Sequence, residues 1–422
     1  MGVPFRNLGP QERRNFALSA LLGFYAGLTL YTLVTEGPWV TVGGDFLAFW
    51  SAGYVANTEG YVRVYDPNLL GTLQRAFVPP GEPYWVRPVF FLPVFILPFQ
   101  GFALFEPWAG HLVWSALNLA ILVGYLRLLA RQSDPMYPSE GLLLALLFSY
   151  PVFNSFLWGQ VSVWLTLCVG ELLRALLKGR ALRAGVWMTG LLLKPQTLPL
   201  LIPALLALGK LRVLGGFVLG SLLVLALSIL MLGGSTGVDR LLDLIALNAK
   251  PLGMTGIASV NMTNWRTFGL HLSNLTSPTV GWGIAGVGMA LTAAAAGYLW
   301  VRARPMGEDA LVIALLGTLA GTGAFTWHSH IHTEMILLPP LVYLGARKAL
   351  PQKVLDLWVF APPGILFLTY LTGAVGRVTG LSLPMGYGAF VVGGSFLALN
   401  LYLLAWAAHR LRRTAVGVHD GG

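Results

Sequence analysis

The chain has 422 residues, of which 56% are hydrophobic and only 10% are charged, and its formal net charge is +10. Soluble domains carry about 25% charged residues, so this composition excludes a cytosolic enzyme, a nucleic-acid-binding protein and a disordered chain. It predicts a polytopic membrane protein, in which lysine and arginine gather in the loops that stay in the cytoplasm.

The predicted membrane spans follow from length, because a helix needs roughly 20 apolar residues to cross a bilayer. Eight segments meet this requirement: 14–34, 107–129, 159–177, 212–232, 279–301, 309–326, 354–373 and 386–408. Shorter apolar runs lie at 88–104, 141–157, 183–193, 195–209 and 334–346. Together they predict one all-α integral membrane domain over residues 1–422, with about ten crossings.

Basic residues predict the orientation of these spans. They cluster before the first span, at 178–183, at 210–212, at 302–304, at 347–353 and at 410–413. Placing all of these clusters in the cytoplasm gives a consistent alternation from residue 178 onward. Both termini are then cytoplasmic, and the outer segments are 35–87, 233–278 and 372–385. Parity requires one of the first five apolar runs not to cross, and the short, proline-rich 88–104 is a candidate.

The stretch 183–209 begins and ends at basic clusters but holds two apolar halves separated by Lys194-Pro195-Gln196. Proline breaks a helix, so the pattern predicts a pair of half-length helices that enter the membrane and return. Lys194 lies deep in this apolar stretch, where an ionisable side chain is costly and a functional role is the first hypothesis. The alternative is a lysine that snorkels or interacts with the end of the first half-helix.

The outer segment 35–87 is too rich in aromatic and charged residues for a passive connector, and we expect amphipathic helices at the interface or a binding surface there. Asp45 is a lone carboxylate among apolar neighbours, a setting that suits a general base. The competing interpretation is a helix N-cap, because Asp45 follows two glycines and precedes an apolar run. The candidate binding residues of this segment are Trp50, Tyr54, Arg63, Tyr65 and Arg87. For the aromatic residues Trp50, Tyr54 and Tyr65 the alternative is an aromatic belt at the membrane interface.

Three of the seven histidines, His328, His330 and His332, fall within the outer loop 327–334, WHSHIHTE. In a helix, His330 and Glu334 share a face, as do His328 and His332, whereas in a strand all three histidines share one. Metal ligation, proton transfer and hydrogen bonding to phosphate are the chemistries open to such a group. A metal site is not favoured, because no matching carboxylate pair lies nearby in sequence.

Several segments together resemble glycosyltransferase family 87. They are DFLAFWSAG at 45–53 with YVRVYDP at 61–67, WVRPVF at 85–90, GQV at 159–161 with LKPQ at 193–196, and the histidine loop followed by LLPPL at 337–341. The family consists of multi-pass enzymes of the GT-C type that use polyprenyl-phosphate sugars, such as polyprenol-phosphate-mannose-dependent mannosyltransferases. The sequence departs from the family pattern in Arg87-Pro88-Val89, where a YPP-like stretch is usual.

The resemblance implies a GT-C-type fold and a hexosyltransferase of the cell envelope, acting in glycolipid biosynthesis at the outer face of the plasma membrane. Asp45 would be the catalytic base, the histidines would assist, and Gln160, Lys194, Gln196 and Glu334 would bind substrate. The partners would be a polyprenyl-phosphate sugar, a lipid or glycan acceptor and membrane lipids, without a cofactor, a divalent metal or nucleic acid. We expect Asp45, a basic residue and at least one histidine to line one cavity.

Two other functions remain open at the level of the sequence. A secondary transporter or lipid-glycan flippase would use the discontinuous helices around Lys194 as its site, although the chain shows no internal repeat. A non-enzymatic lipid-binding or scaffold protein would make Asp45 and the histidines dispensable.

Overall fold

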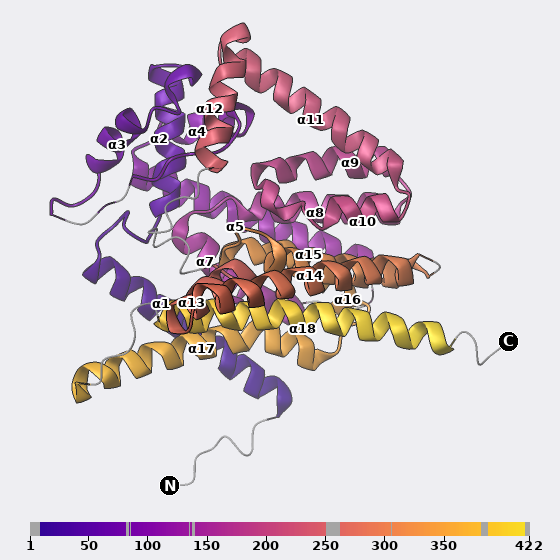
Figure 1. Ribbon diagram of the computed structural model, residues 1–422. Coiled ribbons are helices and arrows are strands. Elements are labelled where there is room, and N and C mark those ends of the chain that lie inside the picture. Colours follow the sequence, from indigo (N-terminus) through magenta and orange to yellow (C-terminus); the bar gives the residue numbers. More distant parts are fainter. Residues whose placement is uncertain are drawn as a thin grey trace.

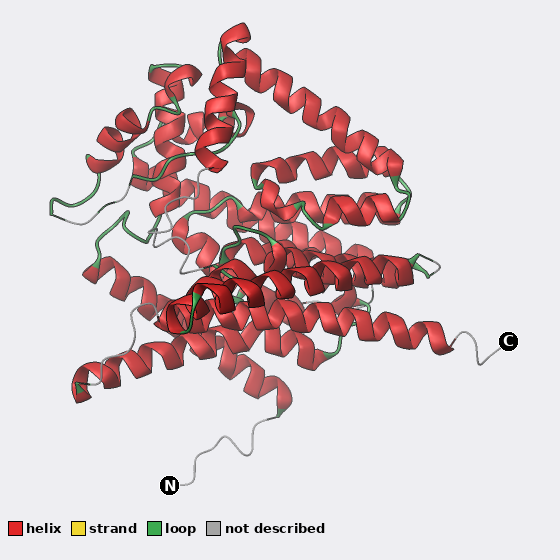
Figure 2. Cartoon of the chain, viewed as in Figure 1, coloured by secondary structure: helices red, strands yellow, loops and turns green. Residues whose placement is uncertain are grey.

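The computed structural model describes residues 9–81, 84, 86–134, 136, 140–249, 262–304, 306–380 and 387–417. Trp85 of the WVRPVF motif and part of the predicted outer segments 233–278 and 372–385 lie outside these residues. Within them the chain is helical and forms no named β-strand (Figure 2). An all-helical polytopic architecture is thus confirmed.

Each predicted span corresponds to a helix (Figure 1). These helices are α1 (Pro10–Thr35), α5 (Pro107–Ser133), α8 (Ser162–Leu177), α11 (Leu211–Met231), α14 (Pro278–Ala303), α15 (Glu308–Phe325), α17 (Gln352–Thr379) and α18 (Tyr387–Gly417). All but α8 contain a stretch that is long and apolar enough to cross a membrane, which gives seven candidates among the described residues. The pair α6 (Glu140–Leu147) and α7 (Tyr150–Trp158), bent by 50°, would make an eighth. The count of about ten crossings stays a prediction.

Shorter helices lie between these spans. They are α2 (Gly44–Thr58), η2 (Tyr61–Arg63), α3 (Pro67–Arg75), η3 (Pro93–Phe95), α4 (Leu97–Phe102), α9 (Ala181–Thr189), η4 (Gly190–Leu193), η5 (Pro195–Thr197), α10 (Leu201–Ala207), η6 (Gly234–Thr236), α12 (Gly237–Ala249), α13 (Trp265–Leu275), η8 (Ile331–Leu337) and α16 (Leu338–Ala346). The apolar helix 93–102 is only 10 residues long, about 15 Å at 1.5 Å per residue. It spans about half of a hydrocarbon core and is too short to cross it.

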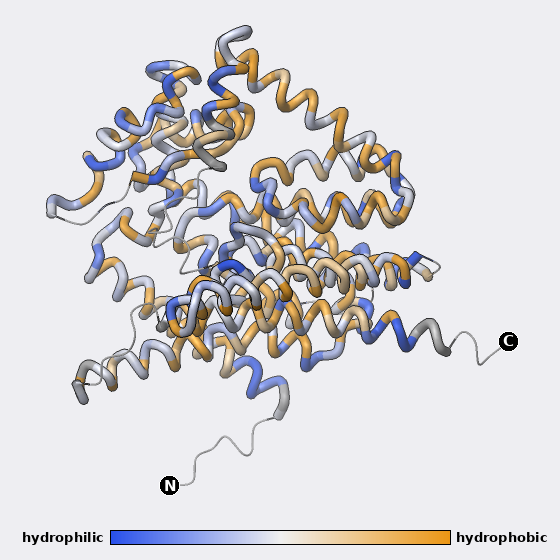
Figure 3. The backbone as a smooth tube through the Cα atoms, in the orientation of Figure 1, coloured by the Kyte–Doolittle hydropathy of each residue, from blue (hydrophilic) through white to orange (hydrophobic). Residues whose placement is uncertain are grey.

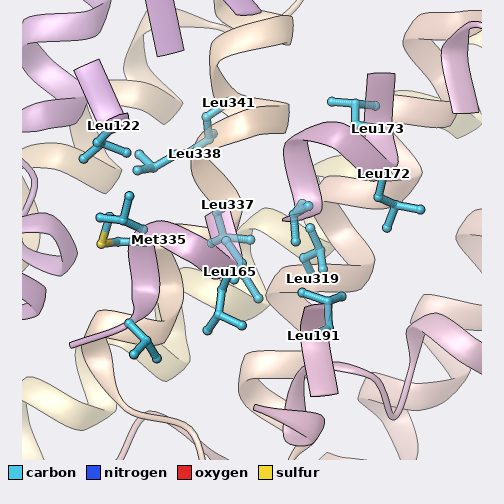
Figure 4. Close-up of a cluster of buried hydrophobic side chains, with 14 of the residues drawn as sticks. Leu122, Leu165, Leu172, Leu173, Leu191, Leu319, Met335, Leu337, Leu338 and Leu341 are labelled. Atoms are coloured by element: carbon cyan, nitrogen blue, oxygen red, sulfur yellow. The ribbon is translucent and has the colours of Figure 1, made fainter. Parts of the chain in front are cut away.

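The core lies where α8, α15, η8 and α16 meet. The apolar window of α15 is 78% buried, the highest value among the candidate spans. Figure 4 shows leucines of α5, α8 and α16 and Met335 of η8 converging with Leu191 and Leu319. The outer helices show hydrophobic residues over most of their length, whereas hydrophilic residues concentrate near helix ends and in the small helices at the upper left (Figure 3). The helices α8, α15 and α16 therefore pack around η8 in the buried centre, and the more exposed helices face outward.

The segment 183–209 forms a hairpin broken at its tip. Helix α9 and η4 run toward the interior of the molecule, Lys194 interrupts them with φ −139° and ψ 80°, and η5 and α10 return. In Figure 1 the turn from α8 to α9 and the turn from α10 to α11 lie at the same end, on the right. The apolar helix 181–193 has 13 residues, about 20 Å, which is too short to cross a hydrocarbon core. That the hairpin enters the membrane and returns stays a prediction.

Of the two α-helices that lie wholly within the first outer segment, α3 is amphipathic as expected and α2 is not. Eleven of the fifteen residues of α2 are buried, including residues on all of its faces. Helix α3 has one buried face, made of Leu70, Gly71 and Gln74. Because α2 packs on α3, α4 and α5, α2 is part of the protein core, whereas α3 keeps an exposed face.

Candidate functional site

The turn before α2 places Asp45. Gly43 is the N-cap residue and adopts φ +72°, a left-handed conformation that glycine accepts without strain. Asp45 therefore lies in the first turn of α2, where a carboxylate interacts favourably with the helix dipole, and does not cap the helix. The N-cap interpretation of Asp45 is wrong because the two preceding glycines themselves make the turn.

Arg87 enters the space that Gly44 leaves open. A Cβ atom on residue 44 would lie 1.6 Å from Arg87 Nη1, so only glycine allows the guanidinium to pass. The Nε atom of Arg87 lies 3.8 Å from Asp45 Oδ1, and Nη1 donates to the carbonyl of Trp39 at 3.4 Å. The Asp45 carboxylate is about a quarter exposed. Its surroundings are therefore more polar than the apolar neighbours of Asp45 in the sequence suggest.

Helix α3 fixes the backbone of Arg87 through one buried amide. Gln74 donates from Nε2 to the carbonyl oxygen of Arg87 at 3.0 Å and accepts from the Arg87 N–H at 3.0 Å. Tyr84 donates to the same Gln74 oxygen at 3.1 Å. The guanidinium also lies over the rings of Tyr84 and Trp158, at 5.6 Å and 5.1 Å from their centroids. These contacts hold a positive charge next to Asp45.

Gln160 reaches Asp45 from the end of α7. Gly159, at φ +70°, ends that helix, and the N–H of Gln160 returns to Ser155 O at 2.8 Å, as in a glycine-terminated helix. The N–H of Gly43 donates to Leu157 O at 2.7 Å, which ties α7 to the turn before α2. Gln160 Nε2 donates to Asp45 Oδ2.

Lys194 continues this chain of contacts from the tip of the broken hairpin. Its Nζ atom donates to Gln160 Oε1 at 2.8 Å and lies 2.8 Å from His332 Nε2. The residue is only 8% exposed. A buried ammonium requires hydrogen-bond acceptors, and Gln160 and His332 supply two. The alternative of a snorkelling lysine is excluded by this burial.

The three histidine rings form a row. His330 is in extended backbone and forms an antiparallel bridge with Met262, and η8 begins at the next residue. The rings of His330 and His332 stack with centroids 5.3 Å apart, and His330 Nε2 lies 3.0 Å from His328 Nε2. Neither a single helix nor a single strand describes the loop, because the backbone changes from one to the other between the second and third histidines.

The loop histidines are held in their neutral form. Burial, followed by the neighbouring His330, Lys194 and Arg266, lowers the pKa of His328 to about 3. Burial, followed by Lys194, lowers the pKa of His330 to about 3. A positive charge on either ring is disfavoured because it would lie beside other cations. The row is thus suited to hydrogen bonding and to proton transfer through neutral rings.

Two expected binding residues lie in a different place. Gln196 and Glu334 line one small cavity between the hairpin, the end of α15 and η8, and Asp45 does not line it. Glu334 Oε1 accepts from Thr263 Oγ1 at 3.1 Å and from Asn400 Nδ2 at 2.8 Å. Glu334 therefore hydrogen-bonds to Thr263 and Asn400 and not to His330.

Four further residues of the first outer segment engage other partners. Trp50 donates from Nε1 to Phe105 O at 3.0 Å and stacks on Tyr54. Arg63 pairs with Asp66 at 3.4 Å on the surface. Tyr65 donates to Phe91 O at 2.6 Å. The structure brings none of these polar groups to Asp45.

Two buried polar residues of this region were not predicted from the sequence. One is Gln74, described above. The other is His111 at the start of α5, which stands close enough to Gly43 and Gly159 that a Cβ on either would lie 3.1–3.2 Å from its ring nitrogens. The sequence offers one signal for each residue. Gln74 is an amide in a short helix, and His111 lies in an apolar span, where a buried polar group is costly without a partner.

The assembled site carries more positive than negative charge. Asp45 contributes one carboxylate, while Arg87 and Lys194 contribute two cations. Arg87 contacts Asp45 directly, and Lys194 is connected to it through Gln160. An anionic group of a substrate would complete the charge balance. Among the residues that the structure describes, no group of three or more His, Cys, Asp or Glu side chains could hold a metal ion.

A comparison with protein-family models identifies a match to Glycosyltransferase family 87 over residues 85–325, which is more than half of the chain. This range includes Arg87, Gln160 and Lys194. Comparisons with the curated proteins and with the solved structures give no significant match.

Proposed function

The chain belongs to glycosyltransferase family 87, and on that premise we propose that it transfers a hexose from a polyprenyl-phosphate donor to a hydroxyl group of a lipid or glycan acceptor. Mannose is the first candidate for the sugar, since the resemblance is to mannosyltransferases. The protein is thus proposed to be a hexosyltransferase of the cell envelope.

A polyprenyl-phosphate donor fits the character of the site. Such a donor carries its own leaving group, an anionic phosphate, and an apolar tail that resides among lipids. The excess positive charge around Arg87 and Lys194 suits the phosphate, and the many exposed apolar side chains of the outer helices suit a lipid environment. No nucleotide is needed in this reaction.

Asp45 is the proposed general base. Both of its neighbours, Gln160 and Arg87, are donors, so the carboxylate is oriented as an acceptor. In the proposed reaction Asp45 takes the proton of the acceptor hydroxyl, and that oxygen forms the new bond to the anomeric carbon. The bond from this carbon to the phosphate oxygen breaks, its electron pair leaves with the phosphate, and the configuration inverts. Proton transfer of this kind contributes about 10²–10⁴-fold to a rate.

Lys194 and Arg87 are the proposed stabilisers of the departing phosphate. Fixed positive groups in a water-poor site act strongly on developing charge, because they need not reorganise during the reaction. The neutral histidine row is next to Lys194 and offers further donors to phosphate or sugar oxygens. No divalent metal is part of this proposal, because Lys194 and Arg87 meet the same electrostatic need.

The proposed location of the reaction is the extracytoplasmic face of the plasma membrane, with both termini in the cytoplasm. The turns α8–α9, α10–α11 and α14–α15 and the C-terminal end of α18 gather at one end of the molecule, while α2 and α3 lie at the other (Figure 1). Basic residues crowd the first set of turns, and such residues favour the cytoplasm.

A secondary transporter is less well supported. The broken hairpin has the form of a transporter site, but Lys194 at its tip is engaged by Gln160 and His332. The observation that carries the enzymatic proposal is this continuous path of hydrogen bonds from Asp45 to Lys194. A transport mechanism does not require a carboxylate such as Asp45 that is oriented by two donors.

The deciding experiment supplies the purified protein in liposomes with a polyprenyl-phosphate hexose labelled in the sugar, together with candidate lipid and glycan acceptors. We expect label in an acceptor product of inverted anomeric configuration, and no transfer from a nucleotide sugar. Movement of intact labelled donor across the bilayer without product would instead identify a flippase. Retention of configuration would contradict the single-displacement mechanism.

A further inference from the structure

A small cavity lies at the C-terminal end of α15, apart from the Asp45 contacts. It is bounded by the hairpin after Lys194, by the last turn of α15 and by η8. Its volume is about 10 Å³, enough for one water-sized occupant and too little for a sugar or a lipid headgroup. The lining residues are Gln196, Thr197, Thr322, Gly323, Thr326, Ser329, Thr333, Glu334 and Ile336.

Glu334 is the acidic residue of this cavity. Its side chain is buried, with 2% of the residue exposed. Its two hydrogen-bond partners among the described residues, Thr263 and Asn400, are neutral and both contact Oε1. The structure records no ion pair between Glu334 and a Lys, Arg or His of the described residues. An ionised carboxylate in such a place is destabilising unless a cation compensates it.

Several other lining residues carry side-chain oxygen atoms, which suit a hard cation. Thr322, Thr326, Ser329 and Thr333 contribute hydroxyl groups. The Oγ1 atom of Thr333 is buried without a hydrogen-bond partner, although buried hydroxyls nearly always have one. Oxygen ligands of this kind are those preferred by hard metal ions.

The end of α15 adds to the attraction for a cation. This 18-residue helix ends at Phe325, and Thr322 and Gly323 of its last turn line the cavity. The C-terminus of a helix carries a partial negative charge and favours cations. The carboxylate, the hydroxyl groups and the helix end all belong to the segment 322–334, and all three favour a cation.

We propose that this cavity binds one monovalent cation, of the size of Na⁺, with Glu334 as its charged ligand. A single carboxylate balances a single positive charge, whereas a divalent ion would leave excess charge near Lys194. Unwound backbone and helix C-terminal ends coordinate Na⁺ in other membrane proteins in this way. The bound ion would join the tip of the hairpin, through Gln196, to α15 and η8. The site is independent of the proposed glycosyl transfer.

The experiment measures binding and not catalysis, so it stands whether or not the enzymatic proposal does. Full-length protein in detergent micelles is exchanged into choline chloride, and ²²Na⁺ retention and the unfolding temperature Tm are measured against NaCl concentration at constant ionic strength. The variants are Glu334→Gln, which removes the charge at constant shape, and Thr333→Val, which removes the unpaired hydroxyl. The matched control is Glu171→Gln, because Glu171 is equally buried but is paired with Arg174 and Arg183.

For the wild type we expect saturable binding of one ²²Na⁺ and a concentration-dependent rise in Tm, since a ligand that binds the folded state stabilises it. Glu334→Gln should lose both responses and Thr333→Val should bind more weakly, while Glu171→Gln should lower Tm yet keep the Na⁺ response. Absence of saturable binding in the wild type, or unchanged binding in Glu334→Gln, overturns the proposal. So does a Tm that follows pH and not Na⁺, which would mean that Glu334 is simply protonated. If Glu334→Gln does not fold, the wild-type measurement and Thr333→Val decide.

Discussion

Lys194 Nζ lies 2.8 Å from His332 Nε2, although 138 residues separate the two in the chain. An ammonium group has three donors and no acceptor, so His332 must accept at Nε2 and carry its proton on Nδ1 when Lys194 is charged. The same ammonium donates to Gln160, which in turn donates to Asp45. The ammonium of Lys194 is therefore connected to the proposed base Asp45 through Gln160 and does not contact it directly.

Replacing Lys194 tests whether its charge or its shape matters. Lys194→Met removes the cation and leaves Gln160 Oε1 and His332 Nε2 without their donor. We expect the rate of transfer to fall by about 10²–10³-fold, the typical loss of one electrostatic stabiliser, mainly in kcat. Unpaired buried acceptors cost about 1–3 kcal/mol, so Tm should also fall. A change in KM alone, with kcat intact, would mean that Lys194 binds donor without assisting departure of the phosphate.

Replacing Asp45 by Asn keeps the shape of the side chain and its contact with Gln160 but removes the base. We expect transfer to fall by about 10²–10⁴-fold with little change in Tm, measured with labelled donor. The matched control is Asp66→Asn. Asp66 lies in the same outer segment and caps α3 through Asn68 and Leu69, and asparagine caps a helix equally well. Wild-type activity in Asp45→Asn would refute the assignment of the base.

The sequence predicts the helices well because a single physical requirement, about 20 apolar residues per crossing, determines them. It does not predict how Asp45, Gln160 and Lys194 meet. Their separations of 115 and 34 residues are bridged by packing between helices, which no local spacing encodes. The family resemblance named these three residues but implied nothing about the order in which they contact one another.

The failures have local causes. Asp45 after two glycines looks like an N-cap, and the left-handed Gly43 that takes this position has no signature beyond being glycine. The expectation of amphipathic helices in 35–87 did not separate α2 from α3, because the burial of α2 comes from its packing on α3, α4 and α5. Asn400, inside the last apolar helix, was an available signal for the partners of Glu334, because an amide there is costly without one.

Gly44→Ala tests how closely Arg87 must approach Asp45. The added methyl group would lie 1.6 Å from Arg87 Nη1, so the guanidinium must move away from the carboxylate. A displacement of this size costs about 10²-fold in rate where positioning matters. The control is Gly101→Ala in α4, where the methyl group meets open space and stability should be unchanged or slightly higher. Equal activity of the two variants would show that the position of Arg87 is unimportant.

The histidine row predicts the pH dependence of stability. The pKa of His328 and of His330 is lowered to about 3 in the folded protein, against about 6.5 in an unfolded chain. Between these values the unfolded state binds protons that the folded state does not, so stability falls as pH decreases through this range and is complete above pH 6.5. We expect Tm to be lower at pH 5 than at pH 7.5, and this difference to shrink in the double variant His328→Asn, His330→Asn. Ser329→Ala, which alters the residue between them, should keep the wild-type difference. An identical pH dependence in the double variant would mean that other groups control acid stability and that the two rings are more accessible to protons than their burial indicates.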